Sequence, residues 1–191
     1  MSSRVLIAGL LALAAAAPVL AEPESFELDP THTYPSFEVN HLGFSVMRGS
    51  FTSTKGTLTL DNAAKKGSVE ATIDAGSVST GFAKRDEHLR SKDFFNVEQF
   101  PTLTFKADNF TWDAKPTQVA GNLTMLGVTK PVTLQVEPTK CDTRIDKAFV
   151  CGAVVTTTIK RTDFGMKAYV PYISDDIKVQ IEVEAAKKKA G

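Results

Sequence analysis

The chain has 191 residues, and its 22 basic and 22 acidic residues give a formal net charge of zero at pH 7. Electrostatic binding of nucleic acid requires a basic surface that displaces phosphate counterions, so this balance argues against a nucleic-acid partner. The length suits one domain that is large enough to bury a core or to enclose one cavity.

The first 21 residues, MSSRVLIAGLLALAAAAPVLA, have the pattern of a secretory signal peptide. Arg4 supplies an early positive charge, an apolar run follows, and Val19 and Ala21 form the kind of pair that precedes signal-peptidase cleavage. The run is too short for a membrane span, and no stop-transfer charges follow it. We therefore expect cleavage after Ala21 and an exported mature chain, residues 22–191, that folds as a single domain.

From Ser36 to Val183, apolar and polar residues alternate in most segments. Alternation with a period of two is typical of antiparallel strands that bury one face, and the pattern predicts about eight strands. A sheet of this size curls and loses its exposed edges by closing into a barrel. The residues that share one face in each segment are Phe37, Val39 and His41; Val69, Ala71 and Ile73; Leu103, Phe105 and Ala107; Val119, Leu123 and Met125; Val132, Leu134 and Val136; Ala153, Val155, Thr157 and Ile159; and Ile177, Val179, Ile181 and Val183.

A β-sandwich of the immunoglobulin kind is the competing architecture. In that fold a tryptophan packs between two cysteines that are far apart in the sequence. Trp112 does not lie between two such cysteines, so we favour an all-β antiparallel barrel.

Two local irregularities are expected along the sheet. Phe51 and Leu58 have opposite parity within one strand-like segment, which predicts a β-bulge near Lys55 and Gly56. The segment TMLGVTKPVTL predicts a tight hairpin, because Gly127 offers the positive φ that such a turn needs.

Residues 80–97 interrupt the alternation and predict a short helix followed by a turn. Phe82 and Leu89 are seven positions apart and therefore share a helix face. A helical insert between the strands of a barrel usually covers one open end. We expect this insert to close one end of the barrel.

The insert carries four notable charges, at Arg85, Asp86, Arg90 and Asp93. A catalytic role would need a serine motif of the G-x-S-x-G type or a local pair of carboxylates, and neither is evident. We expect these charges to form ion pairs and helix-end hydrogen bonds that fix the insert over an apolar interior. No catalytic residue is predicted.

Cys141 and Cys151 bracket a short, strand-flanked segment. Two cysteines at this spacing in an exported protein predict a disulfide across a hairpin, because oxidising compartments favour such bonds. A redox pair is the alternative, but the spacing is not C-x-x-C.

The segment RTDFGM leaves two interpretations open. Phe164 and Met166 share a parity and could line a cavity, or they could simply pack in the core. Arg161 and Asp163 are expected to face the other way.

The three histidines, His32, His41 and His88, do not have the spacing of a metal site. No H-x-H or H-x-x-x-H pattern joins them, so we do not expect a metal. His41 shares the phase of Phe37 and Val39; it is either a buried histidine with one structural hydrogen bond or a contact to a ligand head group.

Four blocks of the sequence together resemble the YceI-like family. They are HTYPSFEVNHLGFSVMRGSFTSTKGTL, RDEHLRSKDFFNVEQFPTLTF, GNLTMLGVTKPVTL, and RTDFGM followed by ISDDIKVQIEVEA. The resemblance spans residues 25–185, and the HLRSKDFF and LGVTKPV segments are unusually specific. The lipocalin G-x-W signature is absent, so the similarity to lipocalins is one of architecture only.

The resemblance implies an extended eight-stranded antiparallel barrel, similar to lipocalins, in the periplasm of Gram-negative bacteria. The family binds a polyisoprenoid chain, including the tail of isoprenoid quinones, inside the barrel. It also includes members associated with cytochrome b-type membrane partners, which makes transient delivery to such a protein an expectation. No cofactor other than the bound lipid is expected, and the oligomeric state, including a homodimer, stays open.

We predict a ligand cavity lined by the inward strand residues and the apolar side chains of the insert. Phenylalanine is frequent, with 12 residues against three Tyr and one Trp, and a barrel of this size can hold one slim apolar ligand. The residues expected to line the cavity are Phe37, Val39, His41, Phe82, Leu89, Phe94, Phe95, Phe105, Leu123, Met125, Phe164 and Met166.

Three functions are weighed. The first is binding, carriage or sequestration of a polyisoprenoid lipid without catalysis, which we favour. The second is an enzyme that acts on a lipid-like or stress-derived small molecule in the same cavity. The third is a structural or protein-binding barrel whose interior is packed solid.

Overall fold

The computed structural model describes residues 22–113, 115 and 117–188. The expected signal peptide, residues 1–21, lies outside the described residues. The described chain is mostly β-structure and contains one α-helix, α1 (Ala83–Arg90). No helix in this part of the chain has the length and apolar character that a membrane crossing requires.

In the described residues, eleven strands form one antiparallel sheet. They are β1 (Glu24–Leu28), β2 (Tyr34–His41), β3 (Ser45–Phe51), β4 (Thr54–Asp61), β5 (Lys66–Asp74), β6 (Val78–Ser79), β7 (Thr102–Thr111), β8 (Thr117–Met125), β9 (Val128–Thr143), β10 (Phe149–Lys160) and β11 (Ile173–Lys187). Two short 3-10 helices, Ala75–Ser77 and Arg161–Phe164, precede β6 and follow β10.

The sheet closes on itself because β1 pairs with both β4 and β11. The ring β1-β4-β5-β7-β8-β9-β10-β11 is an eight-stranded antiparallel barrel, as the sequence predicts. The three remaining strands extend this ring at one end. There β2 pairs with β11, β3 pairs with β2, and β6 pairs with β3.

The parity change in segment 51–60 has a different origin from the one expected. The strand breaks at Thr52 and Ser53, between the end of β3 and the start of β4. Pairing of β4 with β5 then continues without a shift from Thr54 to Asp61. The predicted bulge near Lys55 and Gly56 is therefore wrong, because a strand break and a bulge change the parity of a sequence in the same way.

The turn between β8 and β9 is confirmed. Leu126 and Gly127 both have positive φ, of 53° and 73°. Positive φ at two successive residues is the geometry of a two-residue hairpin turn, and glycine adopts it without steric cost.

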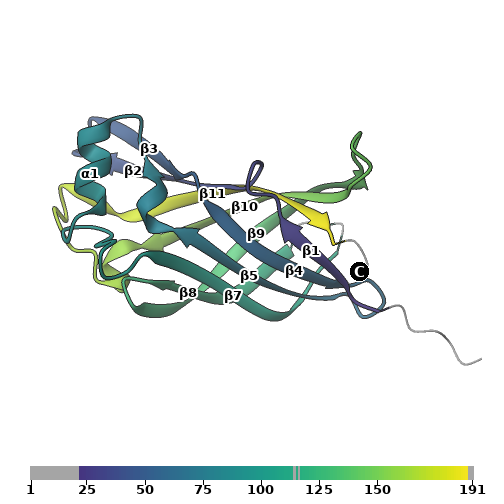
Figure 1. Ribbon diagram of the computed structural model, residues 1–191. Helices are drawn as coiled ribbons and strands as arrows, with labels where there is room; N and C mark the ends of the chain where they lie inside the picture. Colours follow the sequence, from purple (N-terminus) through teal and green to yellow (C-terminus); the bar gives the residue numbers. More distant parts are fainter. Residues whose placement is uncertain (1–21, 114, 116, 189–191) are drawn as a thin grey trace, which may run out of the picture.

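The barrel is long and has two different ends (Figure 1). The first, which we call the α1 end, carries α1, the β2–β3 turn and the β10–β11 connection. The opposite end carries the β4–β5 and β9–β10 turns and the C-terminal end of β11. A core cluster at the α1 end includes Phe51, Val78, Phe95 and Phe164.

Candidate functional site

The barrel encloses a cavity of about 1070 Å³. Its lining reaches from His41 and His88 at the α1 end to Lys65 and Phe149 at the opposite end. Except for Ala107, every strand residue that shares an expected inward face lines this cavity. The interior is thus not packed solid, which contradicts the third function weighed above.

The segment that follows β6 forms one wall of the cavity at the α1 end. Leu89 of α1 lines the cavity, together with Phe94 and Phe95 from the turn that follows. The Phe95 ring packs edge-on against Phe51, with centroids 5.3 Å apart. The Phe94 ring stacks on Tyr169 of the β10–β11 connection at 6.0 Å. The insert therefore joins two distant segments over the apolar interior.

Ten of the twelve residues predicted to line the cavity do so. They are Phe37, Val39, His41, Leu89, Phe94, Phe95, Phe105, Leu123, Met125 and Met166. Contact of these residues with a ligand stays a prediction.

The other two predicted lining residues, Phe82 and Phe164, lie elsewhere. Phe82 precedes the first helical residue in an extended conformation, so the helix spacing does not apply to it, and 55% of its surface is exposed. Phe164 is buried in the core cluster at the α1 end, outside the cavity lining.

Three charged residues of the insert, Arg85, Asp86 and Arg90, form hydrogen bonds to backbone groups and a hydroxyl group instead of the expected ion pairs. Arg85 donates to the hydroxyl and the carbonyl oxygen of Thr80, at 2.7 and 2.9 Å. Asp86, which is buried, accepts from the backbone N–H and the hydroxyl of the same Thr80. Arg90 donates to the carbonyls of Gly76 and Val78.

The expected ion pairs are therefore wrong for Arg85, Asp86 and Arg90. Asp93 alone of the four contacts a basic side chain, His88, with 3.0 Å between Oδ2 and Nε2. Their hydrogen-bond partners come from the chain segment that precedes the helix. Sequence spacing within the helix could not reveal them, since Thr80, Gly76 and Val78 lie outside it.

Arg161 is a buried cavity residue that sequence parity missed. It begins a short 3-10 helix, so the two-residue period ends there, and its side chain is 2% exposed. Its guanidinium group donates to the backbone carbonyls of Met166, Ala168, Ile173 and Ser174. Burial lowers its pKa, against the opposing effect of Asp175. These four hydrogen bonds from the Arg161 guanidinium group hold the β10–β11 connection in place beside the cavity.

Glycines opposite aromatic residues make room for the rings that line the cavity. A β-carbon on Gly49 would lie 2.5 Å from Cζ of Phe37, its partner across the β2–β3 ladder. A β-carbon on Gly121 would clash with Cζ of Phe105. A glycine within a strand is a sequence signal for such close approach.

A disulfide joins Cys141 and Cys151 at the opposite end of the barrel, which confirms the sequence prediction. The two residues are direct partners in the β9–β10 ladder, with Cα atoms 4.0 Å apart. Both line the cavity. The bond therefore ties together two adjacent strands of the cavity wall.

Among the residues that the structure describes, one buried hydroxyl of the cavity lining has no hydrogen-bond partner. Thr54 is 5% exposed, and its Oγ1 makes no hydrogen bond. Thr33, another buried lining residue, contrasts with it: its hydroxyl donates to the Glu184 carbonyl and accepts from the Glu184 N–H.

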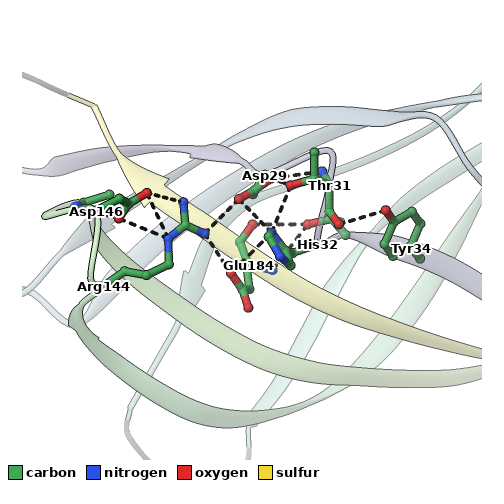
Figure 2. Close-up of polar contacts among 9 residues, drawn as sticks. Asp29, Thr31, His32, Tyr34, Arg144, Asp146 and Glu184 are labelled. Carbon is green, nitrogen blue, oxygen red and sulfur yellow. Dashed lines mark hydrogen bonds and ion pairs between the residues drawn. The ribbon is translucent and has the colours of Figure 1, made fainter.

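A polar network on the outside of the barrel joins the β1–β2 loop, β11 and the β9–β10 turn (Figure 2). Nη1 of Arg144 lies 3.1 Å from Oδ2 of Asp29 and 3.3 Å from Oε2 of Glu184. Nδ1 of His32 lies 3.0 Å from the same Asp29 oxygen. Arg144 also pairs with Asp146 in its own turn, at 2.9 Å.

This network stabilises the ionised form of Asp29. Hydrogen bonds from Thr31 contribute most, and with those from His32 and Arg144 they hold the pKa of Asp29 well below its usual range, although burial opposes them. Asp146 and Asp29 raise the pKa of Arg144 above its ordinary value.

Asp29, His32 and Glu184 also place one potential metal-ligand atom each within 4.8 Å of one another. In this arrangement the positive charge between the two carboxylates comes from Arg144. This cluster joins the β1–β2 loop, β11 and the β9–β10 turn, and it lies on a different part of the barrel from the α1 end.

Together, the closed barrel and its apolar interior define a protein of the lipocalin-like binding class. The wall has the alternating inward side chains of a small barrel that holds one slim ligand.

Comparison with known proteins agrees with this class. The model of the YceI-like domain matches residues 26–185. A UPF0312 protein of Yersinia enterocolitica is 35% identical over 187 residues, which cover 96% of each chain. A UPF0312 protein of Pectobacterium atrosepticum is 35% identical over 180 residues and 93% of each chain. The chain belongs to the YceI-like family.

Solved structures show the same fold. The YceI protein of Campylobacter jejuni has a TM-score of 0.69 at 31% identity, with coverage of 78% of this chain and 90% of that one. A polyisoprenoid-binding domain from Saccharophagus degradans has a TM-score of 0.63 at 17% identity, with coverage of 86% and 99%. At that identity the second likeness shows the fold alone.

Proposed function

We propose that this protein binds a polyisoprenoid lipid, an isoprenoid quinone or a polyprenyl chain, and carries or sequesters it in the periplasm. The observation that carries the proposal is the 1070 Å³ cavity, lined along the barrel by inward apolar side chains. The name of the Saccharophagus degradans neighbour, a polyisoprenoid-binding domain, supports the same ligand class. Catalysis forms no part of the proposal.

Burial of hydrocarbon supplies the binding free energy. Each isoprene unit removed from water contributes about 3 kcal/mol gross, from about 0.8 kcal/mol per CH₂-sized group. Ordering the flexible chain offsets part of this gain. The α1 end, where His41 and His88 line the cavity, would receive a polar head group. We further propose that the protein delivers a bound quinone to a membrane protein of the cytochrome b type.

Native mass spectrometry of the mature protein from periplasm tests the function directly. We expect a stoichiometric adduct whose extracted mass identifies an isoprenoid chain. The absence of an adduct, together with no uptake of added quinone or polyprenol, would refute lipid carriage.

His41→Ala tests the head-group role separately. We expect weaker binding of a quinone but unchanged binding of a hydrocarbon chain of equal length, such as squalene for a tail of six units. Equal quinone affinity in both proteins would leave His41 with a structural role only.

A further inference from the structure

Exposed apolar side chains gather at the α1 end of the barrel. In the described part of the chain, six of the nine large apolar residues that are exposed belong to this end. We call them the apolar rim, and they are Leu42, Phe44, Val46, Phe82, Tyr169 and Tyr172. Exposed apolar residues gathered at one end of a protein indicate a site of interaction with another apolar surface.

The most exposed member, Phe44, stands at the tip of the β2–β3 hairpin. It is 89% exposed, and the tip sequence from Leu42 to Met47, LGFSVM, contains no charged residue. A tip without charges can enter a hydrocarbon layer without the cost of burying an ion.

Two of the chain segments that carry the rim are directly joined. The N–H of Leu42 donates to the carbonyl of Tyr172 at 2.9 Å, which joins the hairpin to the β10–β11 connection. In Figure 1 this hairpin and α1 lie at the same end of the barrel. Phe82, which directly precedes α1, adds the third segment.

One residue of the rim, Tyr169, also belongs to the cavity lining. Tyr169 is 53% exposed and at the same time lines the cavity, where its ring stacks on Phe94. His88 and Arg48, which are also exposed, line the cavity at this end. Apolar and polar side chains thus both border the cavity at this end, and Tyr169 connects the exposed rim with the interior.

We propose that the apolar rim docks the protein on a lipid bilayer, with Phe44 inserted and Tyr169 and Tyr172 at the level of the head groups. Tyrosine favours this interfacial position because its ring is apolar and its hydroxyl is polar. A bilayer fits the surface because it brings hydrocarbon to the end of the barrel where Tyr169 lines the cavity. A second copy of the chain would instead cover that end.

The charges near the rim predict how strongly membrane binding depends on salt. The connections at the α1 end, residues 42–44, 80–101, 126–127 and 161–172, carry six basic and five acidic residues. This near balance leaves apolar insertion as the main attraction, so binding should depend little on salt.

Flotation with vesicles of phosphatidylethanolamine and phosphatidylglycerol tests the proposal on the mature protein. We expect Phe44→Ser to weaken vesicle binding roughly tenfold or more, since one fully inserted aromatic side chain is lost. Ile145→Ser is the matched control, because Ile145 is fully exposed in the β9–β10 turn at the opposite end. We expect this control to bind like the original chain.

Fluorescence locates the inserted residue. A tryptophan placed by Phe44→Trp should shift its emission to the blue and be quenched by brominated lipid, whereas one placed by Ile145→Trp should not. Equal behaviour of the two variants, or loss of all binding at high salt, would overturn the proposal. So would a dimer in solution that Phe44→Ser dissociates while vesicles stay unbound.

Membrane docking and lipid carriage can be tested separately. Flotation uses vesicles without isoprenoid, so docking can hold even if no cargo is found. Conversely, a protein that carries lipid but never floats with vesicles would keep the proposed function and lose the docking surface.

Discussion

Gly49 lies directly opposite Phe37 in the β2–β3 ladder, and the Phe37 ring occupies the space that a side chain on Gly49 would need. The nearest other atom to that space is Cγ2 of Thr80, at 2.8 Å from the position of a β-carbon. The α1 end of the cavity wall is therefore shaped by the absence of one side chain.

Gly49→Ala should lower the free energy of unfolding by about 1–3 kcal/mol, because the added methyl group overpacks the contact with Phe37. Urea unfolding measures the change. The double variant Gly49→Ala with Phe37→Leu should recover part of the loss, since the smaller side chain leaves room. An unchanged stability in the single variant would show that the ring can move aside freely.

Arg161→Met should lower the free energy of unfolding by about 2–4 kcal/mol, because it leaves the buried and part-buried carbonyl acceptors of the β10–β11 connection without this donor. Arg161→Lys should recover only part of this loss, since an ammonium group cannot reproduce the planar fork of five donors. Lys167→Met, at an exposed position of the same connection, is the control and should change stability little. Equal losses in the Met and control variants would contradict a special role for Arg161.

Thr54→Val should leave the free energy of unfolding unchanged or raise it by up to about 1 kcal/mol, because it replaces a buried hydroxyl that has no partner with a methyl group of similar size. Thr33→Val should instead lower it by about 1–2 kcal/mol, since both hydrogen bonds to the Glu184 backbone are lost. Thermal unfolding of the two ligand-free variants measures the difference. A loss in Thr54→Val as large as in Thr33→Val would mean that the Thr54 hydroxyl has a partner in solution.

Asp29→Asn should be less stable than the original chain at pH 7, by about 1–2 kcal/mol, because the carboxylate accepts several hydrogen bonds in the folded state. The lowered pKa of Asp29 fixes the sign of the pH effect. Its stabilisation is fully present above the unfolded pKa, near 3.9, and is lost as the pH falls from there toward the folded value.

The difference between the two proteins should therefore be constant at neutral pH and shrink below about pH 4. Denaturant unfolding at a series of pH values measures it. Lys140→Met, which removes an ion pair with Asp142 on the exposed part of β9, is the control for surface charge and should have a small effect. A difference that grows on acidification would contradict this account of Asp29.

Much of the barrel and its cavity could be predicted from the sequence. The inward residues Phe37, Val39 and His41 follow from a period of two, which is a local property of an extended chain with one buried face. The disulfide could be predicted from the spacing of the two cysteines and the expectation of export, and the β8–β9 turn from one glycine. The prediction that Phe82 lines the cavity was wrong because this residue lies just before the helix, where the helical period does not yet apply.

The composition and alternation of the chain determined an all-β barrel with an apolar interior, since these depend only on which neighbouring residues share a face. Only the tertiary structure decided which distant residues meet. Arg144 reaches Asp29 across 115 positions, and Arg161 turns toward carbonyls that follow it in the chain. Likewise, three separate segments form the apolar rim. Such contacts depend on how the closed sheet brings its connections together, and no local period in the sequence encodes that arrangement.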